Sequence, residues 1–267
     1  MYDNVCKFLA EQFTSDIAKW LLGEAIPMTE LSPSELSLEP IRADSIMLLA
    51  STPLVLHVEF QIKPKIELLF RMLDYRVRGY RRYPDKQMRQ VVVYLIRSNS
   101  PLVMQNTFTL EKTRHEFEVI RLWEQPTELF LTAPGLLPFA VLSQTDNPTA
   151  VLTQVAAEID KIEDRRVQAN ITGTAAILAG LVLEKQSVGQ ILRREIMRES
   201  VIYQEILQEG EEKGLQKGVQ LGLQQGVQQG VERLEQAARN LLASGMAVEQ
   251  VANLIGLPLE RVRSLQG

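Results

Sequence analysis

The sequence predicts an α/β protein in which a mixed β-sheet flanked by helices is followed by an all-helical C-terminal extension. Two observations support this fold class. Short strand-like segments are interrupted by a single helix, and helical periodicity continues from about residue 150 to the end. The 267 residues are 45% hydrophobic and 23% charged, as in a folded globular protein rather than a disordered one.

The elements follow in order along the chain. An amphipathic helix is expected over Asp3–Leu22, where apolar residues recur at helical spacing until Pro27 breaks the pattern. Three strands, a helix and a buried-type strand come next, an order that places the helix across one face of the sheet. The predicted ranges are strands Leu36–Ile41, Ser45–Ala50 and Leu54–Ile62, helix Ile66–Tyr83, strand Gln90–Ile96, and strands around Thr107–Leu110 and Glu116–Trp123.

The change to helical periodicity sets the predicted domain boundaries. Residues 1–150 form the α/β domain, residues 151–209 a helical extension, residues 210–231 a glycine-rich tract, and residues 232–267 a small helical module. The helices expected in the extension and the module are Ala150–Ile159, Ile171–Leu183, Val188–Leu207, Leu234–Ala243, Val248–Ile255 and Leu259–Leu265.

The glycine-rich tract has two interpretations. Its glycines either permit close helix–helix contact, in a dimer or against the core, or make a flexible tether, since each costs a helix about 1 kcal/mol relative to alanine. Positions four apart drift by ~40° around a helix, which favours the tether or a wrapping contact over a straight seam. A homo-oligomer through the C-terminal helices is one expected partner. The repeated residues are Gly210, Gly214, Gly218, Gly222, Gly226 and Gly230.

Composition limits the function classes. The single cysteine, Cys6, excludes an intramolecular disulfide and thiolate metal clusters. The chain shows no leader pattern and no apolar stretch long enough for a bilayer, so a cytoplasmic protein without membrane contact is expected. The net charge of −4 argues against a uniformly basic protein but permits a local basic patch.

Polar residues of the third strand suggest a metal site. Strand alternation puts His57, Glu59 and Gln61 on one face, with Glu59 and Gln61 about 7 Å apart. Asp44 begins the preceding strand, and an antiparallel hairpin brings it towards Glu59. Paired carboxylates suit Mg²⁺, or Mn²⁺ in its place. A sheet with one wet face gives the same alternation without chemistry, and His57 fits a partly buried strand residue better than a ligand.

The helix that follows is strongly basic. Residues 63–89 contain nine Lys or Arg and three acidic residues, a local charge of +6. A stripe of Arg71, Tyr75, Arg78 and Arg82 at helical spacing suits contact with a nucleic-acid backbone. The alternative is a solvated helix face. It is less favoured because the positive charges are concentrated directly after Asp44 and Glu59.

These residues carry a resemblance to a known family. The chain resembles the recombination-promoting nuclease/putative transposase family of the PD-(D/E)XK nuclease superfamily, over about residues 1–150 and in its glycine-repeat tail. The resemblance implies a restriction-endonuclease-like core. The runs that carry it are Glu35–Asp44, Leu56–Gln61, Phe70–Tyr75 and Gln90–Leu95.

The resemblance also implies residue roles. Asp44 and Glu59 match the acidic metal ligands, joined by the Phe60 backbone carbonyl, and Asp3 matches an acidic residue of the opening helix. Gln61 stands where the wider superfamily has lysine, so it orients water by hydrogen bonding without supplying positive charge.

The residues and the resemblance therefore indicate two functions. The first is a Mg²⁺-dependent DNA endonuclease, which the resemblance links to recombination or mobile elements. The second is a catalytically silent DNA- or protein-binding module that assembles through its helical tail. A metal-independent hydrolase is poorly supported, because His57 and His115 sit in no recognisable nucleophile arrangement.

Overall fold

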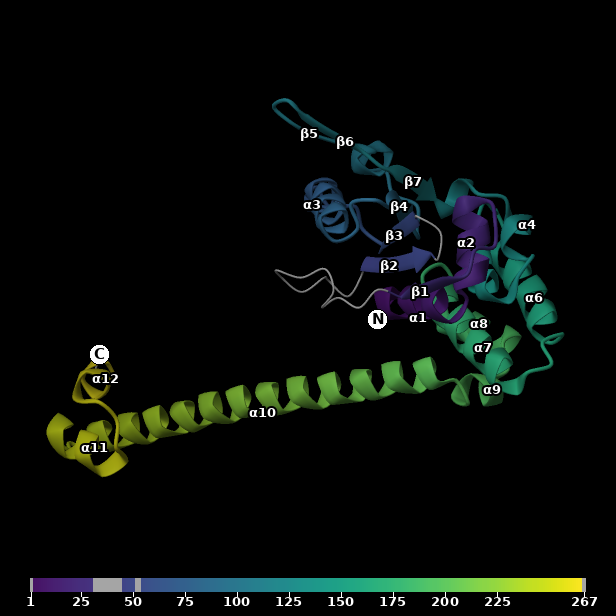
Figure 1. Ribbon diagram of the computed structural model, residues 1–267. Helices are drawn as coiled ribbons and strands as arrows, with labels where there is room; N and C mark the ends of the chain where they lie inside the picture. The colour runs from purple at the N-terminus through teal and green to yellow at the C-terminus, as the bar shows by residue number, and fades with distance from the viewer. Residues whose placement is uncertain (1, 31–44, 51–53, 266–267) are drawn as a thin grey trace. The chain divides into compact units, whose positions relative to one another are not determined.

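The structure, a computed structural model, describes residues 2–30, 45–50 and 54–265 (Figure 1). Its internal contacts separate residues 1–206 from residues 207–267, and each unit is described by itself. The domain boundaries expected at residues 150, 209 and 231 remain predictions. None of the described helices combines the length and the apolar character needed to cross a bilayer.

The first unit contains a mixed sheet and most of the helices. Its strands are β1 (Met28–Glu30), β2 (Ser45–Ala50), β3 (Leu54–Gln61), β4 (Gln87–Tyr94), β5 (Thr107–Leu110), β6 (Thr113–Glu116) and β7 (Glu118–Arg121). Its helices are α1 (Tyr2–Gln12), α2 (Thr14–Leu22), α3 (Glu67–Arg82), α4 (Thr127–Phe130), α5 (Leu137–Ala140), α6 (Pro148–Ile159), α7 (Arg165–Ala179), α8 (Lys185–Ile191) and α9 (Arg194–Arg198). Short 3₁₀ turns lie at Pro101–Met104, Leu122–Glu124 and Pro134–Leu136.

The main sheet has the order β1-β2-β3-β4-β7. The first three strands pair antiparallel, whereas β3–β4 and β4–β7 are parallel. Helix α3 makes the crossover between β3 and β4, so the expected mixed α/β core with a crossing helix is confirmed. Strands β5 and β6 form a separate hairpin that projects away from the main sheet (Figure 1).

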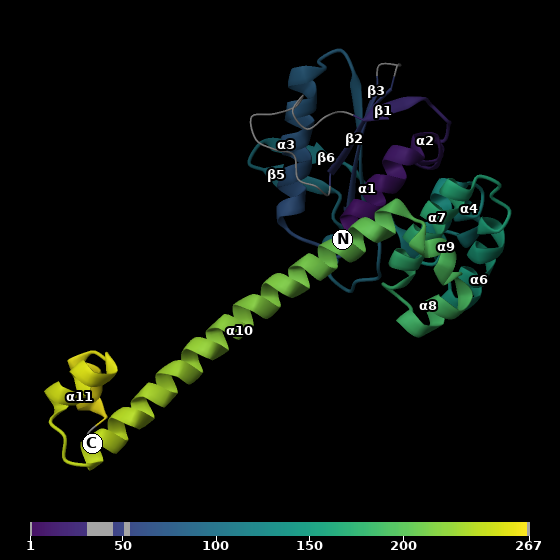
Figure 2. The same ribbon diagram turned by 90° about the horizontal axis from the view of Figure 1, so that it is seen from below.

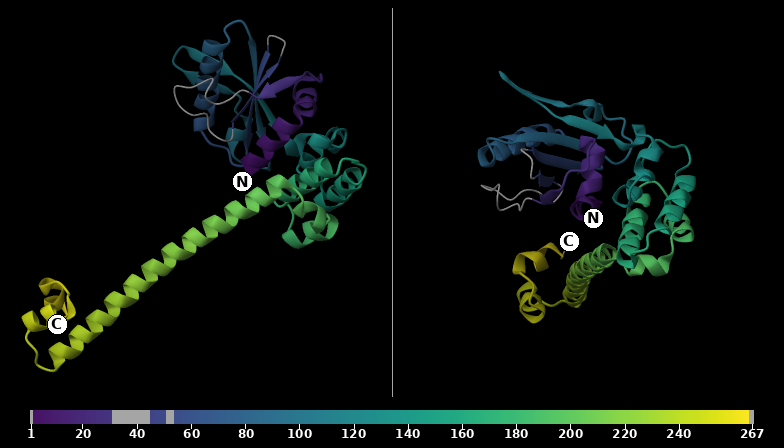
Figure 3. Two further views of the ribbon diagram at one scale, coloured as in Figure 1. Left: turned by 60° about the horizontal axis from the view of Figure 1, so that its bottom comes forward. Right: turned by 45° about the vertical axis from the view of Figure 1, so that its right-hand side comes forward.

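Alternation along the central strands divides the core into two layers. Leu56, Val58 and Phe60 pack with α1, α2 and the later helices, while Val92 and Tyr94 pack with residues of α3. Figures 2 and 3 show α3 on one side of the sheet and the group α4–α9 beside α1 and α2. The central strands β3 and β4 are therefore covered on both faces.

The prediction of one opening helix over Asp3–Leu22 is wrong. Phe13 has non-helical backbone angles (φ −124°, ψ 46°) and separates α1 from α2. At this break, Gly135 packs closely on Phe13 and its N–H donates to Asp16 at 2.9 Å. The contact joins residues 119 positions apart, so local apolar spacing does not reveal it.

Several other predicted strands and helices match the structure, and some do not. Strand β1 was not predicted, and the predicted strand Leu36–Ile41 lies outside the described residues. The strand expected around Glu116–Trp123 is confirmed as β7, although it ends in a 3₁₀ turn from Leu122. In the helical region, α6 and α7 confirm two expected helices, and the range Val188–Leu207 is divided among α8, α9 and the start of α10 (Val201–Ala243).

The second unit consists of the rest of α10 together with α11 (Val248–Ile255) and α12 (Leu259–Ser264). The glycine-rich tract is helical throughout, inside α10. At each of its six glycines, apart from the adjacent helix backbone, no described atom lies within 4 Å of the position that a Cβ would take. Close helix–helix contact by these glycines therefore stays a prediction.

The end of α10 belongs to a small helical module. Ala238, Val251, Ala252 and Val262 form its buried cluster, and Arg261 pairs with Glu235. The expected helices over 248–255 and 259–265 are confirmed.

Two helical glycines distinguish the effect of side-chain packing on stability from the effect of helix propensity. A Cβ at Gly173 in α7 would lie 2.7 Å from the Ser200 Cβ, while Gly222 in α10 faces open space. We expect Gly173→Ala to lower the free energy of unfolding by about 1–3 kcal/mol through overpacking, measured by urea denaturation. Gly222→Ala should instead stabilise α10 locally by about 1 kcal/mol, measured by amide hydrogen exchange. Equal effects of the two substitutions would contradict this packing.

Candidate active site

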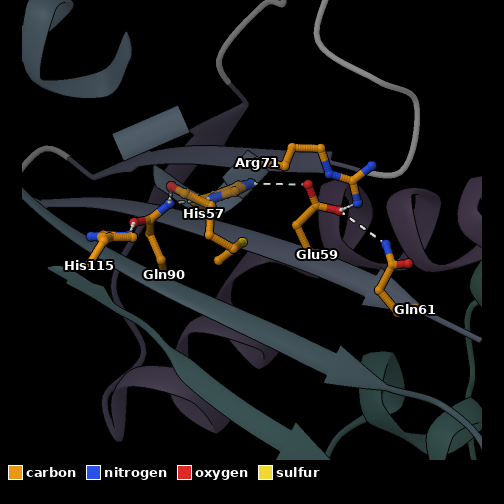
Figure 4. Close-up of polar contacts among 7 residues, drawn as sticks. His57, Glu59, Gln61, Arg71, Gln90 and His115 are labelled. Atoms are coloured by element: carbon orange, nitrogen blue, oxygen red, sulfur yellow. Dashed lines mark hydrogen bonds and ion pairs between the residues drawn. The ribbon is translucent and has the colours of Figure 1, made fainter. Parts of the chain in front are cut away.

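The polar residues of β3 lie on its α3-facing side. His57, Glu59 and Gln61 alternate with the apolar residues of the opposite face, and their exposed fractions are 0%, 0% and 3%. The predicted common face of Glu59 and Gln61 is confirmed, since the Gln61 amide donates to Glu59 Oε2 at 3.2 Å (Figure 4). A buried polar group requires such partners, because it loses its hydration on folding.

Helix α3 supplies a charge partner for Glu59. Arg71 Nη2 donates to Glu59 Oε2 at 3.0 Å, and the Arg71 side chain is 11% exposed. On the other side of the carboxylate, His57 Nε2 lies 3.7 Å from Glu59 Oε1. The guanidinium offsets the cost of burying the negative charge, which an isolated carboxylate in this position would not tolerate.

Two further residues extend this polar cluster. Gln90 of β4 bonds to His57 Nδ1 at 2.9 Å and to the Met72 carbonyl oxygen at 2.8 Å, and His115 Nε2 bonds to Gln90 Oε1 at 2.8 Å. Burial lowers the pKa of His115, and the positive charge of Arg76 lowers that pKa further. Sequence reasoning missed Gln90, although a lone amide beside the apolar run Val91–Ile96 was the available signal.

Asp44, the other predicted carboxylate ligand, lies outside the described residues, as does any contact it makes. Ser45, the next residue, is paired with Glu59 in the β2–β3 register. The start of β2 therefore lies beside Glu59, as the hairpin argument expected. The side chain of Asp3, at the start of α1, also lies outside the described part of the chain.

The ring and the backbone carbonyl of Phe60 point in different directions. Its ring is buried on the opposite side of the sheet, stacked on Phe139 with centroids 5.7 Å apart. The neighbouring Gln61 carbonyl accepts from Leu95 N at 2.9 Å, on the β4 side. Because successive carbonyls of a strand alternate, the Phe60 carbonyl is directed towards the β2 side.

The predicted nucleic-acid stripe on α3 has two differently placed halves. Arg71 reaches Glu59, and Tyr75 is 3% exposed and packs edge-on against His57 at 4.8 Å. Arg78 pairs with Asp74 at 2.9 Å, and Arg82 is exposed. Arg71 and Tyr75 therefore face the sheet, Arg78 is only 17% exposed, and Arg82 alone of the four is classed as exposed.

The donor types at Glu59 fit a hard cation. A carboxylate and a backbone carbonyl supply oxygen atoms of the kind that Mg²⁺ prefers. Within residues 2–30, 45–50 and 54–265, no three His, Cys, Asp or Glu side chains are grouped as a metal ion would need.

A cavity of about 560 Å³ opens elsewhere, beyond the end of β4. Arg97, Trp123 and Asp146 are among its lining residues, while Glu59 and Gln61 are not.

Comparisons with known proteins give no relative: no protein-family model, no curated protein and no solved structure matches this chain.

The buried ion pair makes a stability prediction. Arg71→Met should lower the free energy of unfolding by about 3 kcal/mol or more, because it leaves the Glu59 charge buried without its guanidinium. The double variant Arg71→Met/Glu59→Gln should be less destabilised than the sum of the two single variants. Urea denaturation of all four proteins measures this coupling.

The matched control is Arg165→Met, which breaks the exposed pair with Glu199. Its unfolding midpoint should stay close to that of the parent. An equally small effect at Arg71 would show that the buried pair does not carry the expected energy.

Proposed function

We propose that the chain is a metal-dependent DNA endonuclease of the PD-(D/E)XK type. The observation that carries the proposal is the meeting of Glu59 and Gln61 on the buried face of β3, with the start of β2 paired beside Glu59. The mixed sheet flanked by helices is compatible with the restriction-endonuclease-like core that the sequence resemblance implies.

The chain's own residues have separate roles in this proposal. Asp44, Glu59 and the Phe60 carbonyl would hold Mg²⁺ or Mn²⁺. When bound, the ion would lower the pKa of a water and offset charge on the scissile phosphate. Gln61 orients the attacking water by hydrogen bonding. Arg71 keeps the Glu59 carboxylate in place and neutralised.

DNA would be held by the basic segment that contains α3. Arg82 is exposed and Arg78 is partly exposed, while residues 63–89 carry the local charge of +6. Backbone contacts of this kind give affinity without sequence preference. The proposed link to recombination or mobile elements comes only from the sequence resemblance.

One observation favours a second function. Glu59 is completely buried and already paired with Arg71, as a purely structural ion pair would be. The chain would then be a catalytically silent DNA- or protein-binding module that assembles through its helical tail.

Plasmid cleavage separates the two functions. Supercoiled DNA is incubated with the full chain and Mg²⁺ or Mn²⁺, and nicked product is quantified on gels. We expect the parent to nick DNA, and both Asp44→Ala and Glu59→Gln to lower the rate on the order of 100-fold or more. Glu199→Gln, a matched change at the exposed pair with Arg165, should leave the rate unchanged.

Gel retardation of the same DNA provides the second measurement. Absence of nicking with either metal, combined with retained DNA binding, would reject the nuclease in favour of the binding module. Nicking that survives both Asp44→Ala and Glu59→Gln would instead place the chemistry at another site.

A further inference from the structure

Four side chains form a continuous polar chain on the α3 side of the sheet: His115, Gln90, His57 and Glu59 (Figure 4). Gln90 is the central member, since His57 and Gln90 are paired residues in the β3–β4 register. His57 is 0% exposed and Gln90 is 5% exposed. In so buried a chain, two donors or two acceptors facing each other are costly, because bulk water does not separate them.

The Met72 carbonyl fixes the orientation of the Gln90 amide. A backbone carbonyl can only accept, so the Gln90 atom 2.8 Å from Met72 O must be the NH₂ nitrogen. Exchanging the amide's nitrogen and oxygen would place two acceptors against each other. The Gln90 oxygen therefore faces His115, whose Nε2 must donate to it at 2.8 Å.

The Gln90 orientation in turn fixes the protonation of His57. The Gln90 nitrogen carries only donor hydrogens, so His57 Nδ1, at 2.9 Å, must accept. A neutral imidazole that accepts at Nδ1 carries its proton on Nε2. That N–H faces Glu59 Oε1 at 3.7 Å, within ion-pair range but beyond a normal hydrogen bond.

We propose that Gln90 is a positioning residue of the candidate active site, which holds His57 as the neutral Nε2–H tautomer with its N–H directed at Glu59. The opposite tautomer would point a lone pair at a carboxylate, which is repulsive. Gln90 thus determines that the Oε1 side of Glu59 meets a donor, while Arg71 and Gln61 donate on the Oε2 side.

The fixed tautomer of His57 also limits which metal ion the site can hold, an inference that rests on the proposed function. Both nitrogens of His57 are in use, Nδ1 as acceptor and Nε2 as proton carrier, so the ring offers no lone pair to a metal. The donors around Glu59 are then oxygens, which suit Mg²⁺ or Mn²⁺. Zn²⁺, which binds well to imidazole nitrogen, would lose that ligand.

The test is ¹⁵N NMR of the metal-free, full-length protein. The chain has two histidines, so its imidazole nitrogen spectrum is simple, and His115→Gln keeps a donor for Gln90 while leaving His57 alone. We expect a protonated Nε2 and an unprotonated Nδ1 at His57, at about neutral pH. A coupling across the hydrogen bond should join Nδ1 to the Gln90 side-chain nitrogen.

Gln90→Leu removes the donor with little change in size. In this variant, the Nδ1–H tautomer of His57 should gain population, because the Glu59 carboxylate alone then disfavours it. His57 protonated on Nδ1, or on both nitrogens, in the parent would overturn the proposal. So would an unchanged Nε2–H tautomer in Gln90→Leu. If that variant does not fold, absence of the coupling in the parent overturns it.

Adding Zn²⁺ to the parent tests the metal consequence. The Nδ1 coupling to Gln90 should persist, and its loss would show that His57 can become a ligand. The tautomer is measured without metal or DNA, so a failure of plasmid cleavage leaves it intact. Conversely, a different tautomer of His57 would contradict the proposed role of Gln90 but would not contradict the proposed nuclease function.

Discussion

Glu59 is a negative charge placed at the centre of a covered sheet, and the surrounding architecture compensates for it. Its strand, β3, lies between β2 and β4, and its carboxylate is 0% exposed, so it has lost its bulk hydration. Compensation comes instead from α3, which runs over the same face and brings Arg71 to 3.0 Å. Since α3 also connects β3 to the parallel strand β4, the topology that buries Glu59 also delivers its cation.

The two faces of the sheet differ in chemistry: one packs the core, and the other also carries the polar residues of the candidate site. One face is apolar where Leu56, Val58 and Phe60 meet the helical layer. The other combines an apolar cluster around Met72 and Tyr94 with the polar chain from His115 to Glu59. A polar chain of this kind specifies its own geometry, because every member constrains the donor or acceptor role of the next.

The sequence was informative wherever local pattern decides structure. Alternation placed Glu59 and Gln61 together, and the hairpin placed the start of β2 beside Glu59, because both follow from strand geometry alone. The break at Phe13 was missed, since it depends on Gly135 far along the chain. The burial of Arg71 was also missed, because a basic stripe looks the same whether it faces solvent or a buried acid.

Gln90 illustrates a different limit of sequence reasoning. Its amide is oriented by the Met72 carbonyl of α3 and bonds to two histidines, His57 and His115. These three partners come from separate elements. No spacing rule joins them. Residues 210–231 show a related limit: their glycines left a tether and a helix contact open. The tract is helical within α10, and the role of its glycines stays a prediction.

The two tryptophans of the chain fall on opposite sides of the sheet. Trp20 of α2 packs against Phe130 and Phe139 in the helical layer, with ring centroids 5.3 and 5.7 Å away. Trp123 packs against the cluster on the α3 side. Variants that keep one tryptophan would thus carry an intrinsic fluorophore in a single layer, and the two layers could be observed optically as separate parts of one domain.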